Sequence, residues 1–350
     1  MADAFENLCA HAREIALLNS IESLLDWDAR CKLPETGSSY RTEQQAYVAR
    51  LVHEKQTDPR IGQWLASVQD TDLTADPHSD SATVIREAQR NYDKQTKLPA
   101  ELVEALTRAT NDGQHAWVEA RRENDFSKFL PYLENVYKLK REQADAIGYE
   151  ECRYDALLDD YEPGGKTRTV RTALEALRQD LVPLLDAIKG SGKSPDRSIL
   201  TRHYPIDIQE RFGSQAAKAI GFEFDRGRLD VTHHPFCTEA GPDDCRITTR
   251  YDSDFFNMAF FGILHEAGHG IYDQGLRKSY YGLGPGHYLS LGIHESQSRM
   301  WENQVGRGRP FCIGCCARGC RRYATGTYHE RELSTAQPQW TITHAFSRPC

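Results

Sequence analysis

The sequence predicts a mainly α-helical protein with a small β-sheet beside one functional helix. Three observations lead to this prediction. Apolar residues recur every three or four positions from about residue 5 to residue 190, as expected for long amphipathic helices. Between residues 204 and 251 the pattern changes to short segments that alternate or carry β-branched residues. From residue 255 to residue 274 helical periodicity returns, and this stretch contains two histidines four residues apart.

Turn-forming residues divide the helical first half into separate helices. Residues 100–109 show the helical pattern clearly, since their apolar side chains repeat at the spacing of one helix face. Clusters of glycine, proline and short polar residues predict breaks at residues 32–37, 76–80, 162–165 and 189–195. The last cluster combines glycine, serine, lysine and proline, and it is the best candidate for a hinge or linker.

The second half is predicted to hold the sheet and two further helices. Residues 222–225 and 246–251 have the alternation and β-branched residues of short strands. Helices are expected at residues 255–274 and from about residue 288 to residue 305. The glycine-rich residues 282–286 separate them as a loop.

The composition excludes several classes of protein. Acidic residues outnumber basic ones, 51 to 43, so the formal net charge is -8 and nucleic acid is not an expected partner. The N-terminus lacks the basic start and continuous apolar core of a secretory signal. The longest apolar run, residues 258–264, is too short to span a bilayer. We therefore expect a cytoplasmic protein with no membrane partner.

Ten cysteines are present, and they fall into two groups. Five are widely scattered before residue 312, which in a reducing compartment indicates ordinary buried thiols. The other five lie in residues 312–350.

The strongest chemical signal is His265-Glu266-x-x-His269. A four-residue step along a helix brings both imidazoles to one face, where they can bind one metal ion, and zinc suits such a site. Glu266 lies about 100° further round the helix from His265 and could take a proton from a metal-activated water. This pattern predicts hydrolysis by metal-activated water with Glu266 as the base.

A catalytic zinc needs a third protein ligand and an open position. The second helix offers Glu295, our predicted third ligand, and His294 as the rival, since only one of two adjacent residues faces inward easily. Asp273, four residues after His269, could accept the other ring N–H of a ligating histidine. A solvated acid near the end of a helix is the alternative interpretation of Asp273.

Four ordered motifs carry a resemblance to a known family. HPF lies at residues 234–236, a DxRxT motif lies at residues 244–248, HEAGHGIYDQG begins with the zinc motif at His265, and LGIHESQSRMWENQVGR follows at residues 291–307. In this order they resemble the M32 metallocarboxypeptidases, the thermostable-carboxypeptidase (Taq type) family. The resemblance covers roughly residues 5 to 311.

The resemblance implies a helical zinc-metallopeptidase fold, of the HExxH gluzincin-like kind, with a small β-sheet beside the active-site helix. It implies release of single C-terminal residues from peptides with a free C-terminus, one zinc per chain with cobalt as a possible replacement, and a homodimer. It supports His265, His269 and Glu295 as ligands and Glu266 as the base. For His234 and Arg246 it suggests contact with substrate, while packing or an ion pair is the alternative.

The resemblance is expected to end at Phe311. We therefore expect a carboxypeptidase-like domain at residues 1–311, with a helical part (1–190) and a zinc-site part (200–311), followed by an aberrant or disordered tail at residues 312–350. The tail has little apolar periodicity. A frameshift or misassembled gene is the leading explanation, and a second zinc site is the alternative, using four tail cysteines: Cys312, Cys315, Cys316 and Cys320.

The missing family motifs, IRxxAD and GxxQ, bear on activity. The arginine of IRxxAD would anchor the substrate carboxylate, and an exopeptidase needs such a cation to select a free C-terminus. A zinc metallocarboxypeptidase is still the function that the sequence favours, and an inactive form of it, with a helix face exposed where partner helices are missing, is the alternative. A zinc endopeptidase or aminopeptidase, and a non-catalytic zinc-binding helical remnant, are the other readings of the sequence.

Overall fold

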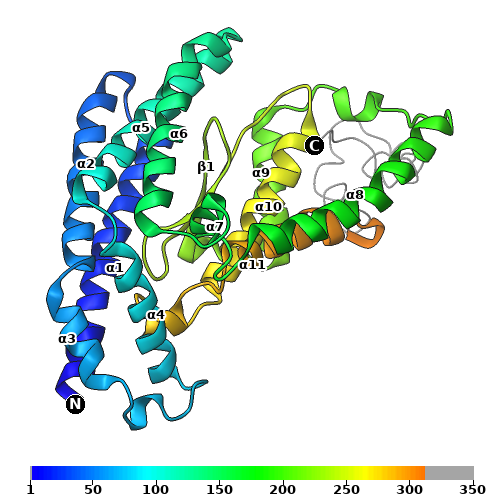
Figure 1. Cartoon of the computed structure of the whole chain (residues 1–350). Coiled ribbons are helices and arrows are strands. Elements are labelled where there is room, and N and C mark those ends of the chain that lie inside the picture. The colour runs from blue at the N-terminus through cyan, green and yellow to red at the C-terminus, as the bar shows by residue number, and fades with distance from the viewer. Residues whose placement is uncertain (1, 312–350) are drawn as a thin grey trace. The chain divides into compact units, whose positions relative to one another are not determined.

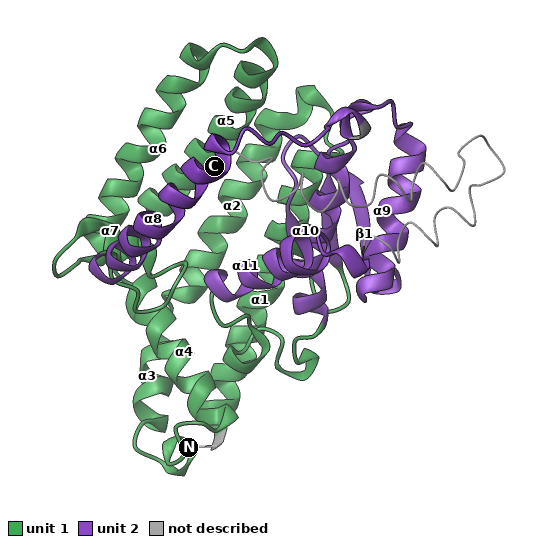
Figure 2. Cartoon of the chain, turned by 90° about the vertical axis from the view of Figure 1, so that its right-hand side faces the viewer, with its two compact units in different colours: residues 1–167, 238–244, 275–290 green, residues 168–237, 245–274, 291–350 purple. Residues whose placement is uncertain are grey.

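The structure is a computed structural model of the chain, and it describes residues 2–311 (Figure 1). The described residues are mainly helical with one small sheet, which confirms the predicted fold class. The chain forms two compact units (Figure 2). Unit 1 comprises residues 1–167, 238–244 and 275–290, and unit 2 comprises residues 168–237, 245–274 and 291–350. The predicted parts 1–190 and 200–311 divide the chain differently and stay a prediction.

Unit 1 contains seven α-helices: α1 (Ala2–Cys31), α2 (Ser38–Gln56), α3 (Pro59–Val68), α4 (Asp80–Gln95), α5 (Ala100–Glu123), α6 (Phe126–Ile147) and α7 (Arg153–Leu158). The predicted breaks at residues 32–37, 76–80 and 162–165 all separate helices. Asp58, Ser79 and Asp125 cap α3, α4 and α6, because each side chain accepts a hydrogen bond from a backbone N–H of the first turn. These local signals explain why the helix starts were readable from sequence.

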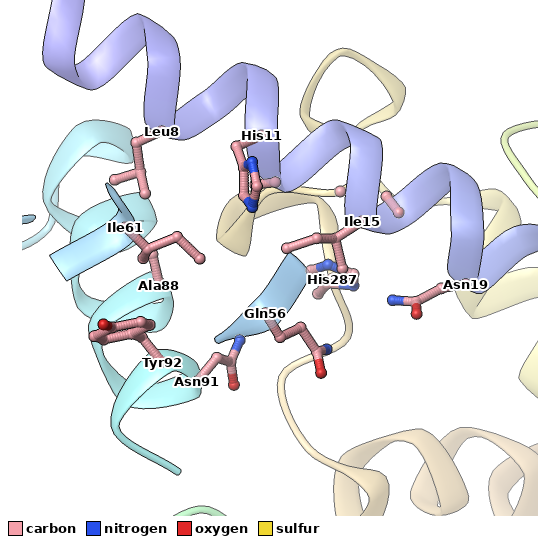
Figure 3. Close-up of a pocket in the computed structure, with 13 residues that line it drawn as sticks. Leu8, His11, Ile15, Asn19, Gln56, Ile61, Ala88, Asn91, Tyr92 and His287 are labelled. Carbon is pink, nitrogen blue, oxygen red and sulfur yellow. The ribbon is translucent and has the colours of Figure 1, made fainter. Parts of the chain in front are cut away.

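Apolar side chains of α1, α3 and α4 form the main core cluster of unit 1, which contains Leu8, Ile61, Leu65, Val68 and Ile85. Beside it lies a cavity of about 130 Å³. Figure 3 shows its lining, with His11, Ile15 and Asn19 from α1 and His287 from a loop. All of its lining residues belong to unit 1, and none belongs to the predicted metal motif.

Unit 2 contains the other α-helices and the sheet, except that Thr238 and Glu239 of β2 belong to unit 1. Its helices are α8 (Thr167–Gly190), which starts at the last residue of unit 1, α9 (Ile206–Ile220), α10 (Phe256–Gln274) and α11 (Leu291–Arg299), which continues as a π-helical turn (Met300–Val305). The sheet has the order β1-β3-β2, with β1 (Gly227–Val231), β2 (Cys237–Glu239) and β3 (Cys245–Thr249). β1 and β3 are parallel, and their register runs from Gly227 opposite Cys245 to Val231 opposite Thr249.

The core of unit 2 joins the sheet to α9 and α10. Phe222, Ile247, Ile263 and Ala267 are at most 1% exposed and pack in one cluster with Ala217 and Cys245. The strands therefore lie against the helix that carries the two histidines, which confirms the small sheet beside the functional helix.

In this region one sequence prediction is wrong, and one helix was not predicted. Residues 222–225 are not a strand: the Glu223 N–H donates to Gln274 Oε1 and the Arg226 N–H donates to Glu223 O, so this backbone forms a 3-10 turn (Phe224–Arg226) instead of a ladder. Helix α9 was not predicted. The signals for it are present, since apolar residues recur every four positions from Ile208 to Ile220 and Gly221, in the left-handed conformation at φ 114°, is an ordinary helix stop.

Among residues 2–311, no helix is long and apolar enough to cross a membrane. The predicted tail and its alternative zinc site at Cys312, Cys315, Cys316 and Cys320 lie outside the described residues.

Candidate metal centre

Packing against its neighbours holds helix α10 in place independently of any metal. Ile263 and Leu264 are 0% exposed and anchor the turn before the histidines. Gly268 allows α11 to approach closely, because a Cβ at this position would lie 2.7 Å from Ser298 Cα and 2.8 Å from Gln297 O. The glycine within the motif thus brings the two predicted ligand-bearing helices together.

The structure brings three of the predicted ligand groups to one point. His265 and His269 lie one turn apart on α10, with ring centroids 5.0 Å apart. Glu295 Oε2 lies 3.5 Å from His265 Nε2 and 3.2 Å from His269 Nε2. Donors at about 2.0–2.2 Å from a tetrahedral zinc are roughly 3.3–3.6 Å apart, so both nitrogen–oxygen distances are close to the edges of a zinc site.

Two neighbours hold the Glu295 carboxylate in place. Arg299 Nε donates to Glu295 Oε1 at 2.7 Å, and the Ser298 hydroxyl donates to Glu295 Oε2 at 3.0 Å. Desolvation opposes ionisation of this group, but the charge of His265 and the Arg299 and Ser298 donors outweigh it and hold the pKa of Glu295 below its usual value. The predicted third ligand is therefore an ionised carboxylate at neutral pH.

Burial also shifts the pKa values of His269 and Glu266. Desolvation, aided by His294 and His265, lowers the pKa of His269 to about 4, so its imidazole is neutral at pH 7 and can offer a lone pair. Glu266 is 6% exposed, and burial raises its pKa to about 7 despite the opposing charge of His265. Glu266 O, His265 N and His269 N atoms all lie within 4.8 Å of one another.

Glu302 is a site residue that our sequence analysis missed. It is 1% exposed, and its Oε2 lies 2.9 Å from His265 Nδ1, where the ring N–H donates to the carboxylate. Arg299 and Arg307 also donate to it. Such a bond fixes the ring orientation and leaves Nε2 as the ligand atom. The available signal was spacing, since Glu302 follows Glu295 by two helical turns.

The prediction that Asp273 pairs with a ligating histidine is corrected by the structure. Asp273 Oδ1 bonds His294 Nε2 at 2.8 Å, not His265 or His269. The His294 ring in turn stacks on His269, with centroids 4.4 Å apart and planes at 16°. His294, the rival ligand, thus points to Asp273 while Glu295 faces both histidines, because adjacent helical residues diverge by about 100°.

The two predicted substrate-contact residues lie on or beside the sheet. His234 is exposed in the connection between β1 and β2. Arg246 is half-buried on β3, opposite Arg228 of β1. Their roles toward substrate stay predictions.

A helix with two histidines and a glutamate, faced by a glutamate from a second helix and backed by a small sheet, defines a helical metallopeptidase-type protein. The chain belongs to the Carboxypeptidase Taq (M32) metallopeptidase family, whose sequence profile matches residues 7–331. This confirms the resemblance. The match continues beyond Phe311, where the resemblance was expected to end.

Individual relatives agree with this assignment. The chain is 46% identical over 318 residues to thermostable carboxypeptidase 1 of Thermus thermophilus, covering 88% of this chain and 62% of that protein. It is 33% identical over 299 residues to carboxypeptidase 1 of Bacillus subtilis, covering 85% and 59% respectively. The crystal structure of the M32 carboxypeptidase from Deinococcus radiodurans R1 matches with a TM-score of 0.83 and 33% identity, covering 97% of this chain and 67% of that one. The chain thus spans about three fifths of the curated relatives' length.

Proposed function

We propose that this chain is a zinc-dependent metallocarboxypeptidase that releases C-terminal amino acids from peptides. The observation that carries the proposal is the position of Glu295 Oε2, 3.5 Å from His265 Nε2 and 3.2 Å from His269 Nε2, next to the buried Glu266. Two nitrogen donors and one carboxylate suit zinc, and they leave one coordination position open.

The proposed metal site consists of three ligands and the residues that position them. His265, His269 and Glu295 would hold the cation, while Glu302 keeps the His265 ring in the right tautomer. When bound, the cation supplies Lewis-acid polarisation of a carbonyl and lowers the pKa of water. Arg299 and Ser298 keep Glu295 from turning away from the histidines.

Glu266 is the proposed general base. Its carboxylate would accept a proton from the attacking water and later deliver that proton to the nitrogen of the departing amine. A carboxyl group with a pKa near neutrality suits both transfers, because neither its protonated nor its ionised form is strongly disfavoured at pH 7.

Action at a free C-terminus is the finer part of the proposal. The metal donors alone do not determine where a substrate ends, so the same site fits an endopeptidase or an aminopeptidase. The family and its named carboxypeptidases favour the C-terminus. The second candidate function is binding of a cation without turnover. It is kept because the chain spans about 62% of the length of thermostable carboxypeptidase 1 of Thermus thermophilus.

The test compares two substrates and one variant. Zinc-loaded protein is assayed on a blocked dipeptide with a free carboxylate and on its C-terminal amide. We expect cleavage of the free acid alone, and we expect Glu266→Gln to reduce the rate by about 10²- to 10⁴-fold with unchanged zinc content. Equal cleavage of the amide contradicts exopeptidase action. A folded, zinc-loaded chain without turnover supports the second candidate.

Two further measurements test the remaining expectations. Light scattering tests the homodimer, and reconstitution with cobalt tests whether that metal replaces zinc.

A further inference from the structure

A second group of possible metal donors lies on the sheet side of α10. Cys237 begins β2, Cys245 begins β3, and Asp273 lies near the end of α10. Cys245 is 3% exposed, Asp273 is 9% exposed, and Cys237 is half-buried. One ligand atom from each of the three lies within 4.8 Å of the others. The proposed catalytic site uses none of the three.

The distances in this group match the edges of a tetrahedral site. Cys237 Sγ lies 3.6 Å from Cys245 Sγ and 3.8 Å from Asp273 Oδ2. With zinc–sulfur bonds of about 2.3 Å and zinc–oxygen bonds of about 2.1 Å, two sulfur ligands lie roughly 3.8 Å apart and a sulfur–oxygen pair roughly 3.5 Å apart. Two of the three edges therefore match a tetrahedral site, and the third, between Cys245 and Asp273, is no longer than 4.8 Å.

We propose that Cys237, Cys245 and Asp273 bind a second divalent cation, of the thiolate-preferring class to which zinc and cadmium belong. Two sulfur donors select such a cation over magnesium or calcium, which prefer oxygen. The three protein donors leave a fourth position for water. This proposal does not depend on whether the chain hydrolyses peptides.

The fold holds the donors in place before any cation binds. β2 and β3 are neighbours in the sheet, and the connection between them is closed by the Ala240 N–H donating to Asp244 O at 2.8 Å. Cys245 packs against α10 at Gly270, where an added Cβ would lie 3.2 Å from its sulfur. A site whose donors need little rearrangement binds with a smaller ordering cost.

Charge and proton balance are consistent with a thiophilic ion. The hydrogen bond with the Cys245 thiol, followed by burial, raises the pKa of Cys237 well above its usual value, so the metal-free thiol keeps its proton. Binding therefore releases two protons, one from each thiol, and leaves two thiolates and one carboxylate around a dication. The resulting net charge is about one negative unit, so the dication offsets most of the ligand charge.

The two carboxylate oxygens of Asp273 face different groups. Its Oδ2 faces Cys237, and its Oδ1 bonds His294, whose ring stacks on His269. A cation in the second site would fix the Asp273 carboxylate, and with it the hydrogen bond that orients His294.

The experiment uses the reduced, metal-free full chain and Cd²⁺ as the probe. To remove competing thiols, five cysteines outside the described residues are replaced by serine: Cys312, Cys315, Cys316, Cys320 and Cys350. We expect Cd²⁺ to produce a sulfur-to-metal charge-transfer band, and to slow alkylation of Cys237 by at least about tenfold because a coordinated thiolate is a poor nucleophile. Peptide mass analysis reads each cysteine separately.

Matched variants identify the donors. Cys237→Ser in this background should abolish the band, whereas Cys152→Ser, a half-buried thiol elsewhere, should preserve it. His269→Ala should also preserve it, since the catalytic donors include no sulfur. The proposal is overturned if the band is absent, if it survives Cys237→Ser, or if Cys237 is alkylated equally fast with and without Cd²⁺. Isolation of a Cys237–Cys245 disulfide that does not bind Cd²⁺ after reduction also overturns it.

Discussion

Helices α8 and α10 both contain apolar residues at helical spacing but have opposite environments. Apolar residues of α8 recur at Val170, Leu174, Leu177 and Leu181, the spacing of one helix face. No residue of α8 is buried, and Leu174 and Leu177 are 59% and 55% exposed. On α10, by contrast, most residues between Ala259 and Gly270 are buried.

The difference teaches what amphipathic periodicity does and does not predict. The pattern predicts a helix and the face that would be buried, but burial needs a partner that the local sequence does not contain. Helix α10 has partners in β3, α9 and α11, so its position is fixed well enough to align the histidines. The exposed stripe agrees with the expectation of an uncovered helix face.

The largest expected effect tests this comparison directly. Leu264→Ala in α10 should lower the free energy of unfolding by about 2–5 kcal/mol, because it leaves a cavity at a fully buried position. Leu177→Ala in α8 should change it by less than about 0.5 kcal/mol. Urea unfolding followed by circular dichroism measures both. Equal losses would mean that α8 is covered in solution.

The second prediction uses the buried acid of α10. Because the folded-state pKa of Glu266 is raised to about 7 from 4.5, its stabilising contribution is complete below pH 4.5 and is lost as pH rises through 7. In metal-free protein the difference in unfolding free energy between wild type and Glu266→Gln should therefore fall by on the order of 3 kcal/mol between about pH 4 and pH 8. Comparing the two chains cancels the opposite titration of His269. A constant difference would contradict the burial of Glu266.

The third prediction concerns the close approach of α11. Gly268→Ala should cost about 1–3 kcal/mol of stability, because the new methyl group meets backbone atoms of α11. Zinc affinity should fall with it, since Glu295 moves with α11. The matched control is Gly262→Ala on the same helix, where the nearest atom to an added Cβ is Thr249 Oγ1 at 3.7 Å. This variant should be neutral or slightly stabilising, and similar losses in both would refute the proximity argument.

The smallest expected effect concerns Glu302, which bonds the His265 ring but is not itself a predicted ligand. Glu302→Gln should weaken zinc binding by about 10- to 100-fold, which is about 1.4–2.8 kcal/mol, because the His265 ring loses its ionised acceptor. Isothermal titration with zinc measures this change. The exposed Glu175 of α8 provides the control, and Glu175→Gln should leave zinc affinity unchanged. Unchanged affinity in Glu302→Gln would remove Glu302 from the site.

Much of the fold was predictable because its signals are local. Glycine and proline clusters separated the helices of unit 1, and a Gly-rich loop separated α10 from α11. The turn at Phe224–Arg226 was mistaken for a strand because the apolar residues alternate over too short a stretch to distinguish a strand from a turn. Just before this turn the Glu223 N–H donates to Gln274, about fifty residues away, and no local pattern contains that bond.

The sequence by itself determined the family and which residues share a helix face: His265 with His269, and Glu295 on the next helix. These follow from backbone periodicity, which acts over a few residues. Only the tertiary structure decided that Glu302 supports His265, that Asp273 binds His294, and that Cys237 and Cys245 lie together behind α10. Such pairings join residues on different elements, so they depend on how closely those elements pack, and Gly268 and Gly270 set that distance for α10.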